Sequence, residues 1–415
     1  MCFWDAWMEL PIVKFPSYVE ELSEEFLPLF KQERQVNQFK RLMTGFVMAE
    51  RNTIAHMNGL FTFHTNQSNL NRFITQPSWD LMKMQQIQIQ MINDVEHDED
   101  GVVVIDDYLV EKYGKELYGT DWYRDHSNGR TIWGLQIADC VFSGKGIYPM
   151  CSTVYLRKKS RWITTGRVFR SKIQIQMEHL THLVEMNLIF SCVVMDSWYF
   201  CKELTRHIED LGKDWVAHSK INRLVKSHGR WVPLEEFAQN LLNETRFRVV
   251  QLGGETYLMK ACTVRMNDMG VVRLVVSLNK HGNLDVYVSN RLDWNELTIV
   301  SKFSRRWDIE VWHKEGKGRY GIEDCLLRCG DGVSMYLTLN AVAVSLLEIA
   351  SLLSPVYATL LKQGRTPEMK QRWVLAELVG QLISSAQRIG DNGMKKIVES
   401  ILCPYKSTMD MRGVT

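Results

Sequence analysis

Residues 102–107 read Val-Val-Val-Ile-Asp-Asp, an apolar and mostly β-branched run that ends in two aspartates. Its length and composition are those of a buried central strand. Side chains alternate along a strand, so Asp106 and Asp107 should point to opposite faces of the sheet. We therefore expect a core strand that presents one carboxylate to a site and turns the other away from it.

A second apolar run, residues 188–196 (LIFSCVVMD), also ends in an aspartate, Asp196. Two strands, 130–142 and 147–156, are expected between the two runs, joined by a Ser-Gly-Lys-Gly turn. Helical periodicity at about 171–186 precedes the second run, and another helix follows it. This order predicts an α/β core with a mixed sheet.

The remaining segments flank or interrupt this core. Residues 247–288 alternate in β fashion between glycine and asparagine turns, while the two ends of the chain have helical periodicity. The acidic turn at 97–101 marks a boundary before the first strand. The predicted organisation is a helical N-terminal region (1–95), the first part of the core (96–203), a β-rich insertion (204–299), the last part of the core (300–360) and a C-terminal helical region (361–415).

Within the N-terminal region, residues 67–74 form a short polar helix with Thr65 or Asn66 as its N-cap. A helix, a turn and a short polar helix are compatible with a helix-turn-helix whose second helix enters a DNA groove. A plain helical packing region is compatible with the same pattern. Both interpretations stay open at this point.

The composition is that of an ordinary globular protein, with 45% hydrophobic and 24% charged residues among 415. The net charge is only +2, so any binding of nucleic acid must come from local patches. Nine cysteines without CxxC pairs indicate free thiols in a reducing compartment. The most apolar run, 333–353, contains Asn340 and Glu348 and is expected to be a buried core helix and not a membrane span.

Residues 155–177 contain seven basic residues and no acidic one. Lys158, Lys159 and Arg161 in this segment are candidates for contacts with a phosphate backbone. A solvated basic loop is the alternative interpretation.

Residues 303–317 (FSRRWDIEVWHKEGK) read as one helix with Arg306, Glu310, His313, Lys314 and Lys317 along one side. Trp307 and Val311 fall off that line and can pack inward. A solvated face with ordinary ion pairs is the alternative. Two strand aspartates and a helix glutamate are, however, the groups that two-metal phosphoryl chemistry requires, and hard oxygen ligands favour Mg²⁺ or Mn²⁺.

These residues resemble a known family. Phe303, Arg306, Glu310 and Lys317 have the spacing of the YREK signature (Tyr, two residues, Arg, three residues, Glu, six residues, Lys), with phenylalanine in place of tyrosine. This signature marks cut-and-paste DDE transposases of the bacterial insertion-sequence type, which have an RNase H-like core. The resemblance covers about residues 100–350, and the family also places a β insertion between its second aspartate and its glutamate.

The resemblance implies roles for particular residues. Asp107, Asp196 and Glu310 would hold the metal ions, with Asp106 as the alternative to Asp107. Arg306 and Lys317 would clamp phosphates, and Lys314 would add to the DNA contact. Phe303 would lack the hydroxyl that bonds the DNA end. His313 is expected to be an exposed helix histidine, and Glu111 and Glu315 are expected to be surface charges.

The implied function is that of a DNA transposase, which binds terminal repeats, cuts the ends with Mg²⁺ (or Mn²⁺) and joins the 3′-ends to target DNA. Its partner would be double-stranded DNA, whose transposon ends the helical region 1–95 would bind. It should act as a homodimer, with the C-terminal region 361–415 as a candidate for the pairing, in the cytoplasm of a prokaryote and on the nucleoid when bound to DNA. Hairpin ends are an expectation from the resemblance, with Trp231 and Trp294 as candidates for holding a base. The alternatives are a catalytically silent DNA-binding protein and a metal-dependent nuclease without strand transfer.

Overall fold

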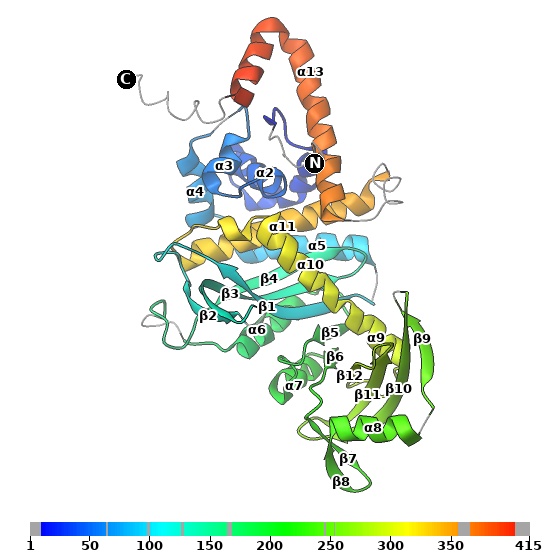
Figure 1. The fold of residues 1–415 in the computed structure, drawn as a ribbon. Coiled ribbons are helices and arrows are strands. Elements are labelled where there is room, and N and C mark those ends of the chain that lie inside the picture. The colour runs from blue at the N-terminus through cyan, green and yellow to red at the C-terminus, as the bar shows by residue number, and fades with distance from the viewer. Residues whose placement is uncertain are drawn as a thin grey trace.

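The computed structural model describes residues 10–402 except 64, 98–99, 126–127, 164–167, 245, 253 and 356–365. The predicted boundary turn (98–99) and parts of the predicted terminal regions (1–9, 361–365 and 403–415) therefore lie outside the described residues. In Figure 1 a large sheet runs through the molecule, with the N-terminal helices and α13 (Pro367–Leu402) together at one end and the β-rich segment at the other.

The core of the sheet has RNase H-like topology, which confirms the predicted fold class. β1 (Val102–Glu111), β3 (Arg130–Ser143) and β4 (Ile147–Tyr155) form an antiparallel meander. β5 (Cys192–Met195) and β6 (Asp214–His218) then continue it in parallel with β1. The parallel connections run through α6 (Lys172–Glu185) and α7 (Lys202–Asp210), as parallel strands require.

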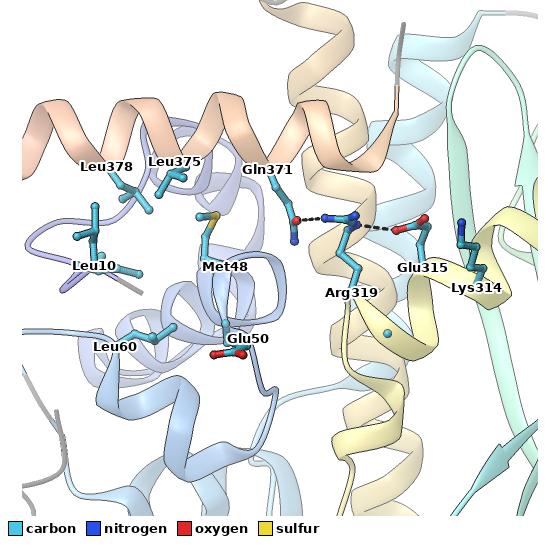
Figure 2. A pocket seen from close by; sticks show the side chains of 13 residues that line it. Leu10, Met48, Glu50, Leu60, Lys314, Glu315, Arg319, Gln371, Leu375 and Leu378 are labelled. Carbon is cyan, nitrogen blue, oxygen red and sulfur yellow. Dashed lines mark hydrogen bonds and ion pairs between the residues drawn. The ribbon is translucent and has the colours of Figure 1, made fainter. Parts of the chain in front are cut away.

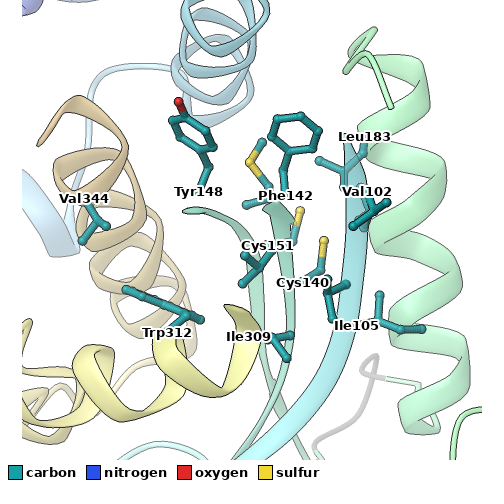
Figure 3. Packing of buried hydrophobic residues seen from close by; sticks show 14 of the residues in the cluster. Val102, Ile105, Cys140, Phe142, Tyr148, Cys151, Leu183, Ile309, Trp312 and Val344 are labelled. Atoms are coloured by element: carbon teal, nitrogen blue, oxygen red, sulfur yellow. The ribbon is translucent and has the colours of Figure 1, made fainter. Parts of the chain in front are cut away.

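Helices cover both faces of this core. α5 (Leu81–Glu96), α10 (Arg306–Gly318) and α11 (Gly330–Leu353) lie along one face, and α6 lies along the other (Figure 1). Figure 3 shows Ile309 and Trp312 of α10 turned toward the strands that carry Cys140 and Cys151. This packing fixes the position of α10 over β1 and β3, and with it the position of every polar side chain on that helix.

α11 is long and apolar enough to cross a membrane, but 83% of its most apolar window is buried inside the protein. Asn340 in this helix donates to the carbonyl oxygen of Tyr320, so that polar group is satisfied within the core. The prediction of a buried core helix is confirmed for this segment.

The β-rich segment extends the core sheet instead of forming a separate one. β12 (Leu284–Ser289) pairs with β6, and β11 (Gly270–Asn279), β10 (Glu255–Met266) and β9 (Arg248–Leu252) follow outward. The described strands thus form one twelve-stranded sheet. The β-rich segment also contains β7 (Leu224–Ser227), β8 (Arg230–Pro233) and the helix α8 (Leu234–Glu244).

Four short strands were not predicted: β2 (Asp121–Asp125), β6, β7 and β8. Each has four or five residues, which is too few for an alternating pattern to stand out. β6 lies inside the range 204–299 assigned to the insertion, yet it pairs with β5 of the core. The domain boundaries themselves stay predictions.

The N-terminal region is helical, as its periodicity indicates. Its elements are α1 (Ser17–Leu22), a 3₁₀ helix (Ser23–Leu29), α2 (Glu33–Met48), α3 (Ile54–Gly59) and α4 (Gln67–Thr75). Asn66 caps α4 by accepting from the backbone N–H of Ser68 at 2.9 Å. Leu70, Phe73 and Ile74 of α4 are buried, whereas its polar residues Gln67, Ser68, Asn69 and Arg72 are exposed.

Candidate active site

The helix that carries Glu310 begins later than predicted. α9 (Glu296–Ser304) ends before α10 starts at Arg306, so Phe303 and Glu310 lie on different helices. Arg305 at the junction donates to the carbonyl oxygen of Ser143 at 2.7 Å, and Asp308 accepts from the Ser143 hydroxyl at 2.5 Å. These two bonds attach the start of α10 to the β3–β4 turn.

The inward face of α10 also differs from the prediction. Ile309, Trp312, His313 and Gly316 are buried, whereas Trp307 is 65% exposed. The prediction that Trp307 packs inward is therefore wrong, and so is the prediction that His313 is exposed. α10 is turned about its own axis so that the 309–312–316 row faces the strands, where Nε1 of Trp312 donates to Asp139 of β3.

Asp106 faces α10. Its Oδ2 lies 3.6 Å from Nη1 of Arg306, and Nη2 of the same guanidinium donates to Oε1 of Glu310. A single arginine therefore links a strand carboxylate to the helix carboxylate. The side chains of Asp106, Arg306 and Glu310 are 20%, 24% and 36% exposed, so this group lies at the surface end of the sheet and is open to a ligand.

Asp107 faces the opposite side of the sheet, toward α6. Its Oδ1 accepts from Nζ of Lys172 and from the hydroxyl of Tyr199, both at 2.7 Å, and its Oδ2 accepts from Nε2 of Gln136 at 2.6 Å. Burial and the Asp107 charge raise the pKa of Tyr199 well above its ordinary value, so its hydroxyl keeps the proton that it donates. Both oxygens of Asp107 are therefore engaged within the protein.

Asp196 lies beside Asp106 at the end of the neighbouring strand. β1 and β5 pair in parallel with Ile105 opposite Met195, so the residue that follows each one reaches the same edge of the sheet. Burial is the main cause that raises the pKa of Asp106 to about 6. The nearby His313 lowers this pKa, and the charge of Asp196 raises it further. Repulsion between two neighbouring carboxylates of this kind is what a bound cation relieves.

Asp139 on β3 is a fully buried carboxylate that contacts the inward face of α10. It accepts from Nε1 of Trp312 at 2.5 Å and from the hydroxyl of Ser152 at 2.7 Å, and Nε2 of His313 lies 3.5 Å away. The His313 ring stacks 4.2 Å from the ring of Tyr108. Sequence reasoning missed Asp139, although an aspartate within the apolar run 137–142 was a signal of a buried polar contact.

Two of the predicted DNA-binding residues, Lys317 and Phe303, lie next to aromatic rings near the carboxylates. Nζ of Lys317 lies 5.7 Å from the Tyr108 ring centroid, on the same helix face as Glu310. Phe303 packs against Tyr287 at 4.8 Å, and the Arg306 guanidinium lies 5.9 Å from its ring. Phe303 thus lies between the Tyr287 ring and the Arg306 guanidinium.

Lys314 lies elsewhere. It lines a cavity of about 380 Å³ between α10, the N-terminal helices and α13 (Figure 2). Glu315 and Arg319 line the same cavity, are joined to each other at 2.6 Å, and are connected through Arg319 to Gln371 of α13. Glu315 is thus an ion-pair partner at a helix interface, and Glu111 pairs with Arg130 at 2.9 Å at the surface.

The other predicted DNA contacts are in the basic segment 155–177 and at the tryptophans of the β-rich segment. Lys158 and Lys159 are exposed, while Arg161 is held by Glu116 at 3.4 Å and by the carbonyl oxygen of Lys115. Trp231 on β8 is 46% exposed. Trp294 lies under Arg291 and Lys302, whose charged groups are 5.4 and 5.2 Å from its ring.

The donor atoms of this site are carboxylate oxygens, which suit a hard divalent cation. Among the described residues no three His, Cys, Asp or Glu side chains stand close enough together to hold a metal ion as they are. Arg306 occupies the space between Asp106 and Glu310. The half-buried, mutually repelling carboxylates Asp106 and Asp196 fit a metal ion, provided that Arg306 moves away from Glu310.

Comparisons with family models and with curated proteins indicate what this chain is similar to. Residues 25–233 match the family described as DDE superfamily endonuclease, and residues 169–346 match the transposase DDE domain. A probable transposase for insertion sequence element IS701 from Microchaete diplosiphon is 26% identical over 255 residues. That match covers 57% of this chain and 64% of the relative's length.

Partial similarity to solved structures includes the piggyBac transposase synaptic complex with hairpin DNA, with a TM-score of 0.44 and 13% identity over 97% of this chain and 83% of that one. The NurA nuclease from Sulfolobus solfataricus has a TM-score of 0.27 and 12% identity, over 57% of this chain and 81% of that one. The first family match spans half of the chain and includes Asp106, Asp107 and Asp196. The chain belongs to the DDE superfamily of endonucleases.

Proposed function

We propose that this protein is a DNA transposase of the insertion-sequence type, which binds the ends of its element, cuts them by metal-assisted hydrolysis and joins the 3′-ends to target DNA. The observation that carries the proposal is that Arg306 links Asp106 to Glu310, while Asp196 lies beside Asp106 at the end of the neighbouring strand. Membership of the DDE superfamily and the transposase DDE match support the same reaction class.

For the first metal ligand we favour Asp106 over Asp107, although the resemblance to the family pointed to Asp107. Asp106 shares Arg306 with Glu310, whereas Asp107 lies on the other face with both oxygens engaged by Lys172, Tyr199 and Gln136. Asp106, Asp196 and Glu310 would hold Mg²⁺, or Mn²⁺ in its place. The bound ion would supply a Lewis acid for activating a water or a 3′-hydroxyl and for stabilising the leaving oxygen.

The chain's own cations would position the DNA. Arg306, freed from Glu310, would bind the phosphate at the cut with its planar fork of donors, and Lys317 would bind a neighbouring phosphate from the same helix face. Phe303 would keep Arg306 in place. The exposed Lys158 and Lys159 would contact the backbone of the duplex away from the cut.

Partners and assembly follow from this reaction. The substrate is double-stranded DNA, first the element's ends and then the target. Two ends need two catalytic cores, so we propose a homodimer, with α13 as the pairing element and the exposed polar face of α4 as the reader of the end sequence. The protein would work in the cytoplasm on the nucleoid. The proposal includes excision through hairpin DNA ends and the assignment of Phe303, Arg306, Glu310 and Lys317 to the YREK signature.

The test is a cutting assay on DNA that carries the element's ends, with Mg²⁺ or Mn²⁺, comparing the wild type with Asp196→Ala. Metal-dependent cutting at the ends that is lost in the variant, followed by joining of the 3′-ends, supports the proposal. Specific end binding without cutting by the wild type under either metal would instead identify a silent DNA-binding protein. Cutting without joining of a pre-cut end would identify a nuclease.

A further inference from the structure

Tyr108 is a buried aromatic residue on the same face of β1 as Asp106. Side chains two residues apart on a strand point to the same side of the sheet, so its ring lies against α10, next to the carboxylate that pairs with Arg306. Tyr108 is 6% exposed, and its hydroxyl makes no hydrogen bond within the described part of the chain. The contacts that Tyr108 makes with α10 are therefore those of its ring.

The Tyr108 ring is held in place by His313. The two ring centroids lie 4.2 Å apart with an angle of 35° between the planes, and Nε2 of His313 lies 3.5 Å from the fully buried carboxylate of Asp139. Trp312, one residue earlier on α10, donates to the same carboxylate. A ring packed between a strand and a helix that are joined in this way presents a fixed surface to other groups on α10.

Lys317 lies one turn beyond His313 on α10 and approaches the same ring. Its Nζ is 5.7 Å from the Tyr108 ring centroid, which is within the range over which the negative face of a ring attracts a cation. Lys317 forms no ion pair among the residues that the structure describes. A carboxylate partner would compete with a phosphate for this lysine, whereas the ring attracts the ammonium group without cancelling its charge.

The position of Lys317 on α10 indicates which phosphate it would reach. Lys317 follows Glu310 by about two helical turns, or roughly 10 Å along the helix axis. The phosphates of one DNA strand follow one another at about 3.4 Å along the duplex axis. A phosphate that meets Lys317 therefore lies within about three nucleotides of the phosphate at the carboxylates.

We infer that Tyr108 is a positioning residue for the reaction: its ring directs the ammonium group of Lys317 toward a single backbone phosphate within about three nucleotides of the cut. This inference rests on the proposed function, since it places the phosphate that is cut at Asp106, Asp196 and Glu310. The role assigned to Tyr108 requires the negative face of the ring and does not require the hydroxyl.

The experiment separates the ring face from the hydroxyl and from the shape of the side chain. Tyr108→Phe keeps the ring and removes the hydroxyl, and replacement of Tyr108 by trifluorophenylalanine keeps the shape but withdraws negative charge from the ring face. The same replacement of Phe142, a core ring that is 1% exposed and stacks on Tyr148, is the matched control. Lys317→Gln removes the charge of the lysine. Melting curves check that each variant is folded.

Binding is measured by fluorescence anisotropy on labelled duplexes that carry the element's end, with Ca²⁺ in place of Mg²⁺ so that the DNA stays intact. Each duplex has one neutral methylphosphonate at a different position on either side of the element's terminal phosphate. The affinities across this set show which phosphate charges each variant uses.

The wild type and Tyr108→Phe should lose about tenfold in affinity at one position within about three nucleotides of the cut. The trifluorophenylalanine variant should lose only about threefold there, because the lysine is no longer directed to that phosphate. Lys317→Gln should lose nothing at that position, and the Phe142 control should keep the wild-type pattern.

Several results would overturn the inference. They are a wild type without a sensitive position in this range, a sensitive position that persists in Lys317→Gln, and a wild-type pattern in the trifluorophenylalanine variant of Tyr108. Loss of the pattern in Tyr108→Phe would assign the role to the hydroxyl, and loss in the Phe142 control would assign the effect to packing in general. Either result also contradicts the inference.

The outcomes also separate this inference from the proposed function. If the wild type fails to cut its ends with Mg²⁺ or Mn²⁺ but shows the pattern that depends on the ring face, the role of Tyr108 stands and the transposase proposal fails. If cutting depends on Asp196 while fluorination of the ring leaves the pattern unchanged, the transposase proposal stands and the role of Tyr108 fails.

Discussion

Arg306 lies between Asp106 and Glu310, with Nη1 3.6 Å from Oδ2 of Asp106 and Nη2 bonded to Oε1 of Glu310. The guanidinium therefore occupies the place where a divalent cation would join the same oxygens. Arginine cannot give up its charge by losing a proton, so it and a metal ion compete for these carboxylates. A DNA phosphate, which binds arginine well, would draw Arg306 away and favour the metal ion.

This competition predicts the effect of Arg306→Gln. Without DNA, the variant should bind Mn²⁺ more tightly than the wild type, by roughly fivefold or more, because a cation next to the carboxylates is removed. With DNA, cutting should fall by about 100-fold because a donor to the phosphate is lost. Calorimetry measures the first effect and the end-cutting assay the second. Lys314→Gln, on the same helix but lining the α13 cavity, is the control. Unchanged Mn²⁺ affinity in Arg306→Gln would contradict the competition.

Asp106→Asn should affect metal binding and cutting, whereas Asp107→Asn should affect the stability of the fold. The first should abolish metal-dependent cutting and weaken Mn²⁺ binding while leaving the thermal stability unchanged or higher. The second should keep Mn²⁺ binding but lower the stability by about 1–3 kcal/mol, since Lys172 loses its charged partner. Mn²⁺ titration and urea unfolding of both variants decide between them. The reverse pattern would return the role of metal ligand to Asp107.

The raised pKa of Asp106 predicts a pH dependence of stability. Its pKa in the folded protein, about 6, exceeds the ordinary value of 3.8, mainly because of burial. The folded state therefore binds the proton more tightly, and this contribution is lost as the pH rises from about 3.8 through about 6. Without metal, the free energy of unfolding of Asp106→Asn should therefore rise relative to that of the wild type as the pH increases, by up to about 3 kcal/mol. Urea unfolding of both proteins at pH 4.5 and 7.5 measures the gain, and a difference that does not change with pH would refute it.

The same pKa predicts how cutting responds to pH. The carboxylate form of Asp106 is the one that binds a metal ion, so at limiting Mg²⁺ the cutting rate should rise as the pH passes through about 6. Saturating Mg²⁺ should move this midpoint to lower pH, because the metal ion favours the ionised form. Rates measured over a grid of pH and Mg²⁺ concentration check the shift. A midpoint that ignores Mg²⁺ would point to another titrating group.

Asp139 should be important for stability. Asp139→Ala leaves Nε1 of Trp312 buried without its acceptor and removes the partner of His313, which should cost about 3–5 kcal/mol of unfolding free energy. Asp139→Asn keeps an acceptor oxygen and should cost less. Asp293→Asn, at an exposed ion pair, should change stability by less than about 1 kcal/mol. Urea unfolding compares the three, and a loss in Asp139→Ala no larger than in Asp293→Asn would refute the role.

The sequence by itself determined the main elements of the core. The apolar run 102–105 and the strand before Asp196 are long and β-branched enough to predict buried strands, and the 330–353 segment is too apolar to be anything but a buried or membrane helix. These patterns reflect local periodicity, which depends on neighbouring residues in the chain. The alternation along β1 likewise required Asp106 and Asp107 to face opposite sides.

Only the tertiary structure decided which of the two aspartates meets Glu310. That choice depends on the face of the sheet on which α10 packs, and α10 is held there by contacts with residues far away in the chain, such as Arg305 with Ser143 and Trp312 with Asp139. The same contacts end α9 before Arg306, bury His313 and leave Trp307 exposed. Periodicity gives the relative directions of side chains on one element, but long-range packing sets the direction of the element as a whole.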